Sequence, residues 1–227
     1  MSGGSSGATS GDNAGSFERF LEGWLVRQEH YLDELLSSPS DSSDDDLRDL
    51  VSRVLAHYQQ YFEEKSKIAQ RNIFLVLSPT WFTSLERAFL WIAGFKPGLA
   101  FQLIADSIDD LTDDQRRRVG RLVQETRSEE RSLNDELAKI QESVAAPPLL
   151  LIARRAGRPV YGEIAEEDTA IESLKTALEV VVTSADSLRI STALKAMEVL
   201  RPVQNVKFLV AAAQLQLRLR TWGLERG

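Results

Sequence analysis

L-S-P-T-W-F-T-S-L-E-R-A-F-L-W-I-A-G-F-K-P-G, residues 77–98, is the stretch of sequence that decides the fold. It carries Trp81 and Trp91, two of the four tryptophans of the chain. Thr83 and Glu86 fit a capping box, in which each side chain binds the other's backbone N–H at the start of a helix. The apolar residues that follow recur at helical spacing, at Leu85, Ala88, Phe89 and Ile92.

The same stretch also contains signals that end one helix and begin the next. Gly94 fits the position after a helix, where a left-handed backbone is favourable for glycine. Pro97 fits the first turn of a following helix, where its missing N–H does no harm. The stretch therefore predicts a short apolar helix between two chain reversals, at the centre of a core.

Outside this stretch, amphipathic patterns predict a helical bundle. Ser16 fits the N-cap of a first amphipathic helix, a second helix begins near Leu47, and a last helix begins at Pro202. Heptad spacing over 112–144 and about 168–200 predicts two long helices that pack antiparallel. Prolines and glycines over 145–167 predict an irregular connection. We expect an all-α bundle of about seven helices.

The composition limits the organisation and the chemistry of the chain. Its 227 residues contain no linker that divides two cores, so we expect one domain over residues 16–227. Residues 1–15 are rich in Gly and Ser and are expected to be disordered. The absence of cysteine excludes disulfides and thiol catalysis and agrees with a nuclear or cytoplasmic location. The net charge of -7 disfavours direct nucleic-acid binding, and no apolar run reaches the roughly 20 residues of a membrane span.

The central stretch, W-x-T-S-x-E-R-A-F-L-W-I-A-G-F-K-P, resembles the signature of the plant Delay of Germination domain, which TGA-type bZIP transcription factors share. The resemblance continues through Trp24 and Gln28, through A-D-x-L-R at residues 185–189, and through W-G at residues 222–223. It implies a structural core signature made of Trp81, Glu86, Trp91, Gly94 and Pro97. It also implies a regulatory role in seed dormancy and abscisic-acid signalling, 2C-type protein phosphatases or bZIP factors as partners, and self-association as a homodimer.

The resemblance further implies where a partner and a cofactor would bind. The first helix resembles the segment that engages a phosphatase, which points to Phe17, Phe20, Leu21, Trp24 and Gln28. The family's haem-ligand positions, two histidines four residues apart in the last helix, correspond to Gln216 and Arg220 here. Haem iron takes His, Met, Cys or Tyr in that role, so we expect no haem, and no other cofactor is indicated.

No motif in the sequence supports an enzyme. There is no Gly-rich phosphate loop and no nucleophile elbow, and His30 and His57 are the only histidines. We expect His57 to be a satisfied structural residue, and no metal site is predicted. The sequence leaves three functions open: a regulatory protein-interaction domain, a transcriptional co-regulator that associates with DNA-bound factors, and a small-molecule sensor with an apolar pocket between the long helices.

Overall fold

The computed structural model describes residues 6–39, 42–144 and 161–226, and this part of the chain forms eight helices and no strand. The all-α class predicted from the sequence is confirmed. The helices are α1 (Ser6–Ser37), α2 (Asp44–Arg71), α3 (Ile73–Leu77), α4 (Ser84–Ala88), α5 (Leu99–Ser107), α6 (Asp113–Val144), α8 (Tyr161–Val199) and α9 (Pro202–Arg226).

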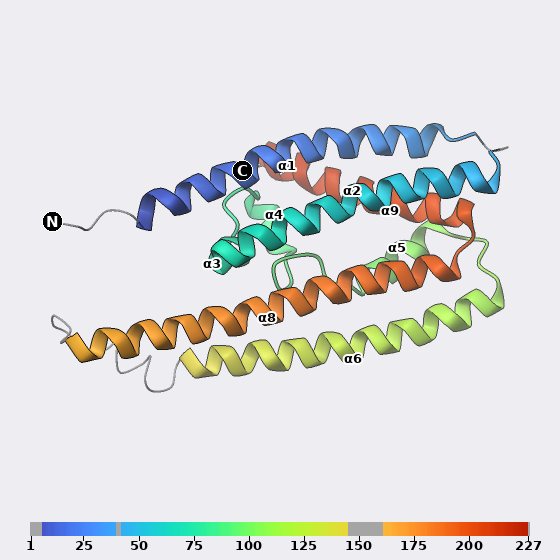
Figure 1. Ribbon diagram of the computed structural model, residues 1–227. Coiled ribbons are helices and arrows are strands. Elements are labelled where there is room, and N and C mark those ends of the chain that lie inside the picture. The colour runs from blue at the N-terminus through green and yellow to red at the C-terminus, as the bar shows by residue number, and fades with distance from the viewer. Residues whose placement is uncertain (1–5, 40–41, 145–160, 227) are drawn as a thin grey trace.

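The long helices form two layers (Figure 1). Helices α1, α2 and α9 pack against one another in one layer, and α6 packs along α8 in the other. The short helices α3 and α5 lie between the layers, and α4 lies beside α9 (Figure 1). The antiparallel pairing predicted from the heptad spacing is confirmed for α6 and α8. Its middle contains a buried contact at 3.3 Å between the hydroxyl groups of Thr126 and Thr192.

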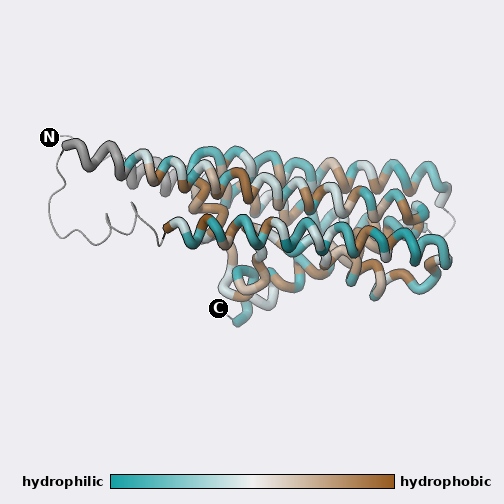
Figure 2. The backbone as a smooth tube through the Cα atoms, turned by 90° about the horizontal axis from the view of Figure 1, so that it is seen from below, coloured by the Kyte–Doolittle hydropathy of each residue, from teal (hydrophilic) through white to brown (hydrophobic). Residues whose placement is uncertain are grey.

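Two groups of buried apolar side chains hold the layers together. The first surrounds Trp24, Trp81 and Val181, and the second surrounds Val54 and Ile104. Helices α1, α2 and α8 contribute residues to both groups. Figure 2 shows the pattern behind this packing, because hydrophobic and hydrophilic positions alternate along each long helix at helical spacing.

Local capping explains several helix boundaries. The hydroxyl of Ser43 accepts a hydrogen bond from the Asp46 amide at the start of α2. At the start of α6 the Gln115 amide donates to the Thr112 hydroxyl over 3.2 Å, and the Gln115 side chain accepts from the Thr112 amide over 3.0 Å. Both pairs satisfy N–H groups that have no partner within the first turn of a helix.

Two predicted boundaries are wrong. Helix α1 begins at Ser6 and not at Ser16, so it extends through much of the Gly/Ser-rich segment. Helix α8 begins at Tyr161 and includes Gly162, which the sequence places in an irregular connection. Glycine lowers helix stability by only about 1 kcal/mol, so it does not by itself stop a helix. The rest of the predicted connection, residues 145–160, lies outside the described residues.

Candidate functional site

The capping box predicted at Thr83 is present at the start of α4. The Thr83 amide donates to Glu86 Oε2 over 2.7 Å, and the Glu86 amide donates to Thr83 Oγ1 over 3.2 Å. Arg220 of α9 donates to Glu86 Oε2 over 3.0 Å and to the Trp81 carbonyl over 2.8 Å. These bonds join α4 to α9. No residue of α4 is buried, so the prediction of an apolar helix at the centre of the core is wrong.

The chain reverses after α4 through a tight turn with an unexpected backbone. Trp91 and Gly94 exchange both backbone hydrogen bonds, over 2.6 and 3.2 Å. Ile92 and Ala93 between them have φ values of 43° and 60°. Two consecutive left-handed residues define a type I′ turn. Gly94 does not have a positive φ, so its predicted role as a left-handed helix cap is wrong.

Arg189 of α8 holds this turn. Its guanidinium donates to the carbonyl oxygens of Trp91, Ile92 and Phe95, over 2.8 Å to Ile92 and 2.6 Å to Phe95. A Cβ atom on Gly94 would lie 2.7 Å from Arg189 Cζ. Glycine is therefore needed at position 94 for close approach by the guanidinium. A left-handed backbone at a β-branched residue such as Ile92 is unfavourable, and these three bonds offset that strain.

A buried ion network connects the turn to α2. Asp186 Oδ1 lies 2.5 Å from Arg189 Nη1 and 2.7 Å from Lys65 Nζ. Lys65 is only 3% exposed, and burial lowers the pKa of its ammonium group to about 8. Such a network is costly to break, because losing one member leaves a buried charge unpaired.

The same segment also binds α6. The Trp91 indole donates to Asn134 Oδ1 over 2.8 Å, and the Gly98 amide donates to Glu130 Oε1 over 2.7 Å. Residues 77–98 therefore link α6, α8 and α9. Of the predicted core signature, Trp81 and Pro97 are buried and Trp91 is half-buried. Pro97 does not open a helix as predicted, because α5 begins at Leu99.

The residues predicted to bind a partner lie inside the bundle. Phe17, Leu21, Trp24 and Gln28 are at most 4% exposed, and Phe20 is half-buried. They pack α1 against α2 and the 77–98 segment, because the apolar face of α1 is one wall of the core. In this conformation these side chains do not offer a surface to a partner. Contact through them would require α1 to leave the bundle.

The two positions that correspond to haem ligands are joined to core residues. Gln216 Oε1 accepts from Gln28 Nε2 over 3.4 Å, and Arg220 makes the bonds to Glu86 and Trp81 described above. An arginine remains protonated and cannot coordinate iron. The residues at this position therefore do not fit a haem iron.

His57 is buried between α1 and α2, as predicted, but its ring is not satisfied. The imidazole stacks on Trp24 at 4.3 Å between ring centroids, and both ring nitrogens lack a hydrogen-bond partner in the described part of the chain. Burial lowers the pKa of His57 to about 4, so the side chain is neutral at pH 7. Among residues 6–39, 42–144 and 161–226, no group of three or more His, Cys, Asp or Glu could hold a metal ion.

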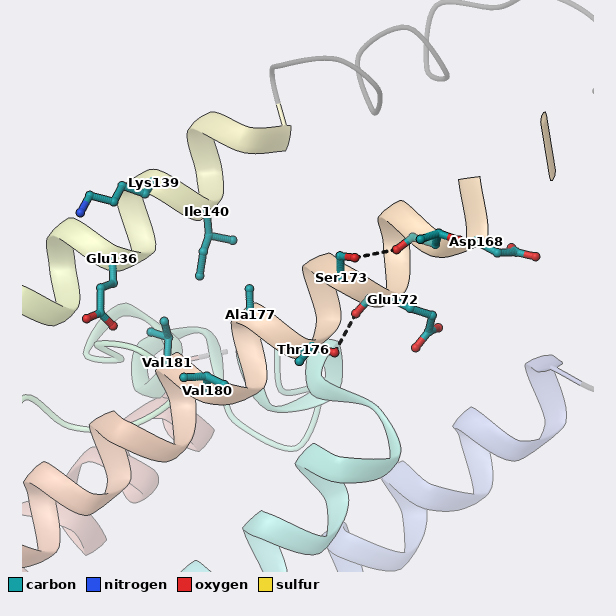
Figure 3. Close-up of a pocket in the computed structure, with 11 residues that line it drawn as sticks. Glu136, Lys139, Ile140, Asp168, Glu172, Ser173, Thr176, Ala177, Val180 and Val181 are labelled. Carbon is teal, nitrogen blue, oxygen red and sulfur yellow. Dashed lines mark hydrogen bonds between the residues drawn. The ribbon is translucent and has the colours of Figure 1, made fainter. Parts of the chain in front are cut away.

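An open groove of about 920 Å³ lies between the C-terminal end of α6 and the N-terminal half of α8. Its apolar lining is Ile140, Ala177, Val180 and Val181, and Figure 3 shows Ile140 and Ala177 facing each other across it. Its charged lining is Glu136, Lys139, Asp168 and Glu172. The sequence left open an apolar pocket between the long helices, and the groove lies between two of them. The heptad rows contained Ile140 and Val181 of its lining, but they did not single out Ala177 or Val180.

The hydroxyl groups in the groove are already engaged. Ser173 Oγ donates to the Thr169 carbonyl over 2.8 Å, and Thr176 Oγ1 donates to the Glu172 carbonyl over 2.9 Å (Figure 3). A ligand would therefore meet an apolar floor with charges at the edge. This arrangement suits the apolar face of a peptide or an apolar small molecule.

Comparison with known proteins identifies the family. A family model described as DOG1, seed dormancy control, matches residues 30–106. Protein RESPONSE TO ABA AND SALT 1 of Arabidopsis thaliana is 38% identical over 221 residues, which are 93% of this chain and 96% of that protein. The chain belongs to the Delay of Germination family. Protein ZW2 of the same plant is also 38% identical, over 92% of this chain and 96% of that protein.

The domain of this Delay of Germination protein is shared with larger transcription factors. Transcription factor TGA5 of Arabidopsis thaliana is 31% identical over 218 residues, which are 94% of this chain but 65% of that protein. The match to the family model contains the whole 77–98 segment, whereas the α6–α8 groove lies beyond it. None of the described helices is long and apolar enough to span a membrane.

Proposed function

We propose that this Delay of Germination protein is a non-enzymatic regulator of abscisic-acid and salt responses, with a role in seed dormancy, and that it acts by binding other proteins. The observation that carries the proposal is the similarity to a protein named for its response to abscisic acid and salt. The aligned residues are 93% of this chain and 96% of that protein. A likeness that covers almost the whole of both chains supports a shared mode of action more strongly than a shared motif would.

Five ionisable groups in the interior of the fold serve structure, which favours binding over catalysis for these groups. Lys65, Asp186 and Arg189 pair with one another inside the fold, and Glu86 pairs with Arg220. These groups have structural partners and do not face the α6–α8 groove. A catalytic acid or base needs a reacting group within hydrogen-bond reach, and none of these five is placed to meet one in that groove.

The partners that we propose are protein phosphatases of the 2C type. Interferometry with the immobilised chain and a panel of purified 2C-type phosphatases tests this directly, with phosphatase activity measured in parallel. We expect saturable binding of at least one phosphatase at micromolar or lower concentration. If no member of the panel binds saturably while the chain remains folded by circular dichroism, the proposed partner class is wrong.

A role as a transcriptional co-regulator is the second candidate, and the similarity to TGA5 favours it. In that case the chain would associate with a DNA-bound bZIP factor, which requires it to be in the nucleus. A second pool of the protein would be in the cytoplasm. An electrophoretic mobility shift with a TGA-type factor on its promoter element separates the two functions. A further retardation on adding the chain supports the co-regulator, whereas retardation without the factor would show direct DNA binding.

The α6–α8 groove also favours a third candidate, a small-molecule sensor. Its apolar floor and volume of about 920 Å³ would accept an apolar ligand. Native mass spectrometry of freshly purified protein tests this candidate. A stoichiometric added mass that is lost on denaturation supports a sensor, and a spectrum of the bare chain speaks against it.

A further inference from the structure

We propose that the α6–α8 groove binds a cationic amphipathic helix of a partner protein. The proposal rests on the proposed function, because it names the site and the chemical class of the partner. The groove belongs to the α6–α8 layer, whereas the α1 residues that the sequence favours lie in the other layer, where four of the five are buried.

The first argument is the exposure of apolar side chains around the groove. Val180 in its lining is 56% exposed, and Val144, one turn after the lining residue Ile140 on α6, is 43% exposed. Their neighbours Leu178 and Val181 are buried in the core. Exposed apolar side chains in and beside a groove with an apolar floor are typical of interaction sites in soluble proteins. Covering them would transfer apolar surface out of water, which favours binding by about 25 cal/mol per Å².

The second argument is the charge at the edge of the groove. Three carboxylates and a single ammonium group line it, at Glu136, Asp168, Glu172 and Lys139. Glu172 pairs with Lys175 over 2.6 Å, whereas Glu136 and Asp168 form no ion pair within the described ranges. The chain as a whole has a net charge of -7. Lysine or arginine residues flanking the apolar face of a partner would therefore be attracted at long range and paired at the edge.

The charge also argues against a second copy of the chain in the groove. A symmetric dimer would place the same surface of both subunits in contact. The groove lining, with three carboxylates and one ammonium group, would then face a lining of the same net negative charge. Like charges that approach in a partly desolvated contact are unfavourable, so a basic partner fits better than self-association.

The third argument is the shape of the groove. Along α8 it runs from Asp168 to Val181, a distance of roughly 20 Å at 1.5 Å per residue. This length matches about three and a half turns of a partner helix, with apolar residues at positions i, i+4, i+7 and i+11. An extended peptide would gain little here, because backbone groups within α6 and α8 are already hydrogen-bonded and offer no strand edge.

The test uses two labelled peptides of 18 residues with the full-length chain. Both carry leucine at positions i, i+4, i+7 and i+11, and they differ only in having lysine or glutamate at the flanking positions. Fluorescence anisotropy should show saturable binding of the lysine peptide and at least about tenfold weaker binding of the glutamate peptide. Raising the salt from about 50 mM to about 500 mM should weaken the lysine peptide, because screening shortens the range of the attraction.

Variants locate the binding site. Val180→Asp should weaken the lysine peptide at least about tenfold by placing a charge in the apolar floor. Combining Glu136→Lys, Asp168→Lys and Glu172→Lys should reverse the preference, so that the glutamate peptide binds better. Leu36→Asp is the matched control, because Leu36 is also 56% exposed. It lies at the C-terminal end of α1, a helix that does not line the groove. The control should bind the lysine peptide as the wild type does.

Three outcomes would overturn the proposal. Val180→Asp could bind the lysine peptide as well as Leu36→Asp does, with both folded by circular dichroism. The chain's own apolar sequence Leu-Leu-Leu-Ile at residues 149–152 could be the occupant, in which case the lysine peptide would bind only after serine replaces these four residues. Sedimentation could show a dimer that Val180→Asp dissociates, which would make a second copy the occupant.

Failure of the groove assignment can be told apart from failure of the proposed function. If a 2C-type phosphatase still binds Val180→Asp, the groove assignment fails while the proposed function stands. If the peptides behave as expected and no phosphatase binds, the proposed partner class fails and the groove assignment stands.

Discussion

Replacing Arg189 with alanine should lower the free energy of unfolding by about 3–5 kcal/mol. The guanidinium donates to three carbonyl oxygens of the 91–95 turn and pairs with Asp186 over 2.5 Å. Hydrogen bonds from a charged donor contribute about 1.5–3 kcal/mol each, but they share one side chain and do not add. The substitution would also leave the left-handed backbone of Ile92 without the bonds that hold it.

Urea unfolding followed by circular dichroism measures this effect. For a chain of this size, a loss of 3–5 kcal/mol corresponds to a melting temperature lower by roughly 6–20 °C. Arg189→Lys should give an intermediate loss, because an ammonium group keeps the charge beside Asp186 but cannot reach three separate carbonyls. Arg118→Ala, at an exposed arginine on α6, is the matched control and should change stability by less than about 0.5 kcal/mol. If Arg189→Ala is within about 1 kcal/mol of the wild type, the guanidinium does not hold the turn.

Three further predictions concern close packing, protonation and haem. Gly223→Ala should destabilise the protein by about 1–3 kcal/mol, because a Cβ atom there would lie 2.0 Å from Thr83 Oγ1, whereas Gly120→Ala, with open space around it, should not destabilise it. The pKa of His57 is about 4 in the folded protein and 6.5 is its ordinary value, so the unfolded chain binds the proton more readily. Stability should therefore fall as the pH falls from 6.5 to 4, by about 1–3 kcal/mol more in the wild type than in His57→Phe; equal pH slopes would contradict this. Titration with hemin should give no saturable Soret band, and a stoichiometric six-coordinate spectrum would contradict the expectation based on the residues of α9.

The long helices could be predicted because their signals are local. Apolar spacing, proline at position 202 and the Thr112–Gln115 capping box lie within a few residues of the elements that they define. The antiparallel pairing of α6 and α8 followed from two matching heptad rows. The start of α1 was mistaken because a Gly/Ser-rich composition disfavours helix formation, yet the structure continues the helix to Ser6.

The 77–98 segment was predicted less well because distant residues decide its backbone. The turn at Ile92 and Ala93 depends on Arg189, which lies 97 residues from Ile92 in the chain. Local rules place the positive φ on Gly94, whereas the structure uses that glycine to make room for a guanidinium. The sequence did contain one signal for this contact. Asp186 and Arg189 are charged residues three positions apart beside the apolar rows of a long helix, where an internal partner is needed.

The candidate partner site shows the same limit. The apolar face of α1 has the pattern of a binding helix, but an apolar face that packs the core has the identical pattern. Burial of Trp24 and Gln28 distinguishes the two only once the fold is known. The α6–α8 groove requires both helices at once, so no single stretch of sequence reveals it.

The measurement that tests the central claim most directly is the fraction of seeds that germinate on abscisic acid. It compares plants from which this protein has been removed with the same plants after the wild type or a variant is reintroduced. The account predicts that loss of the protein changes the abscisic-acid sensitivity of the seeds. The wild type and Leu36→Asp should restore it, and Val180→Asp should not, at equal protein abundance. Full restoration by Val180→Asp would contradict a regulator that acts through the α6–α8 groove, and unchanged sensitivity without the protein would contradict the regulatory function itself.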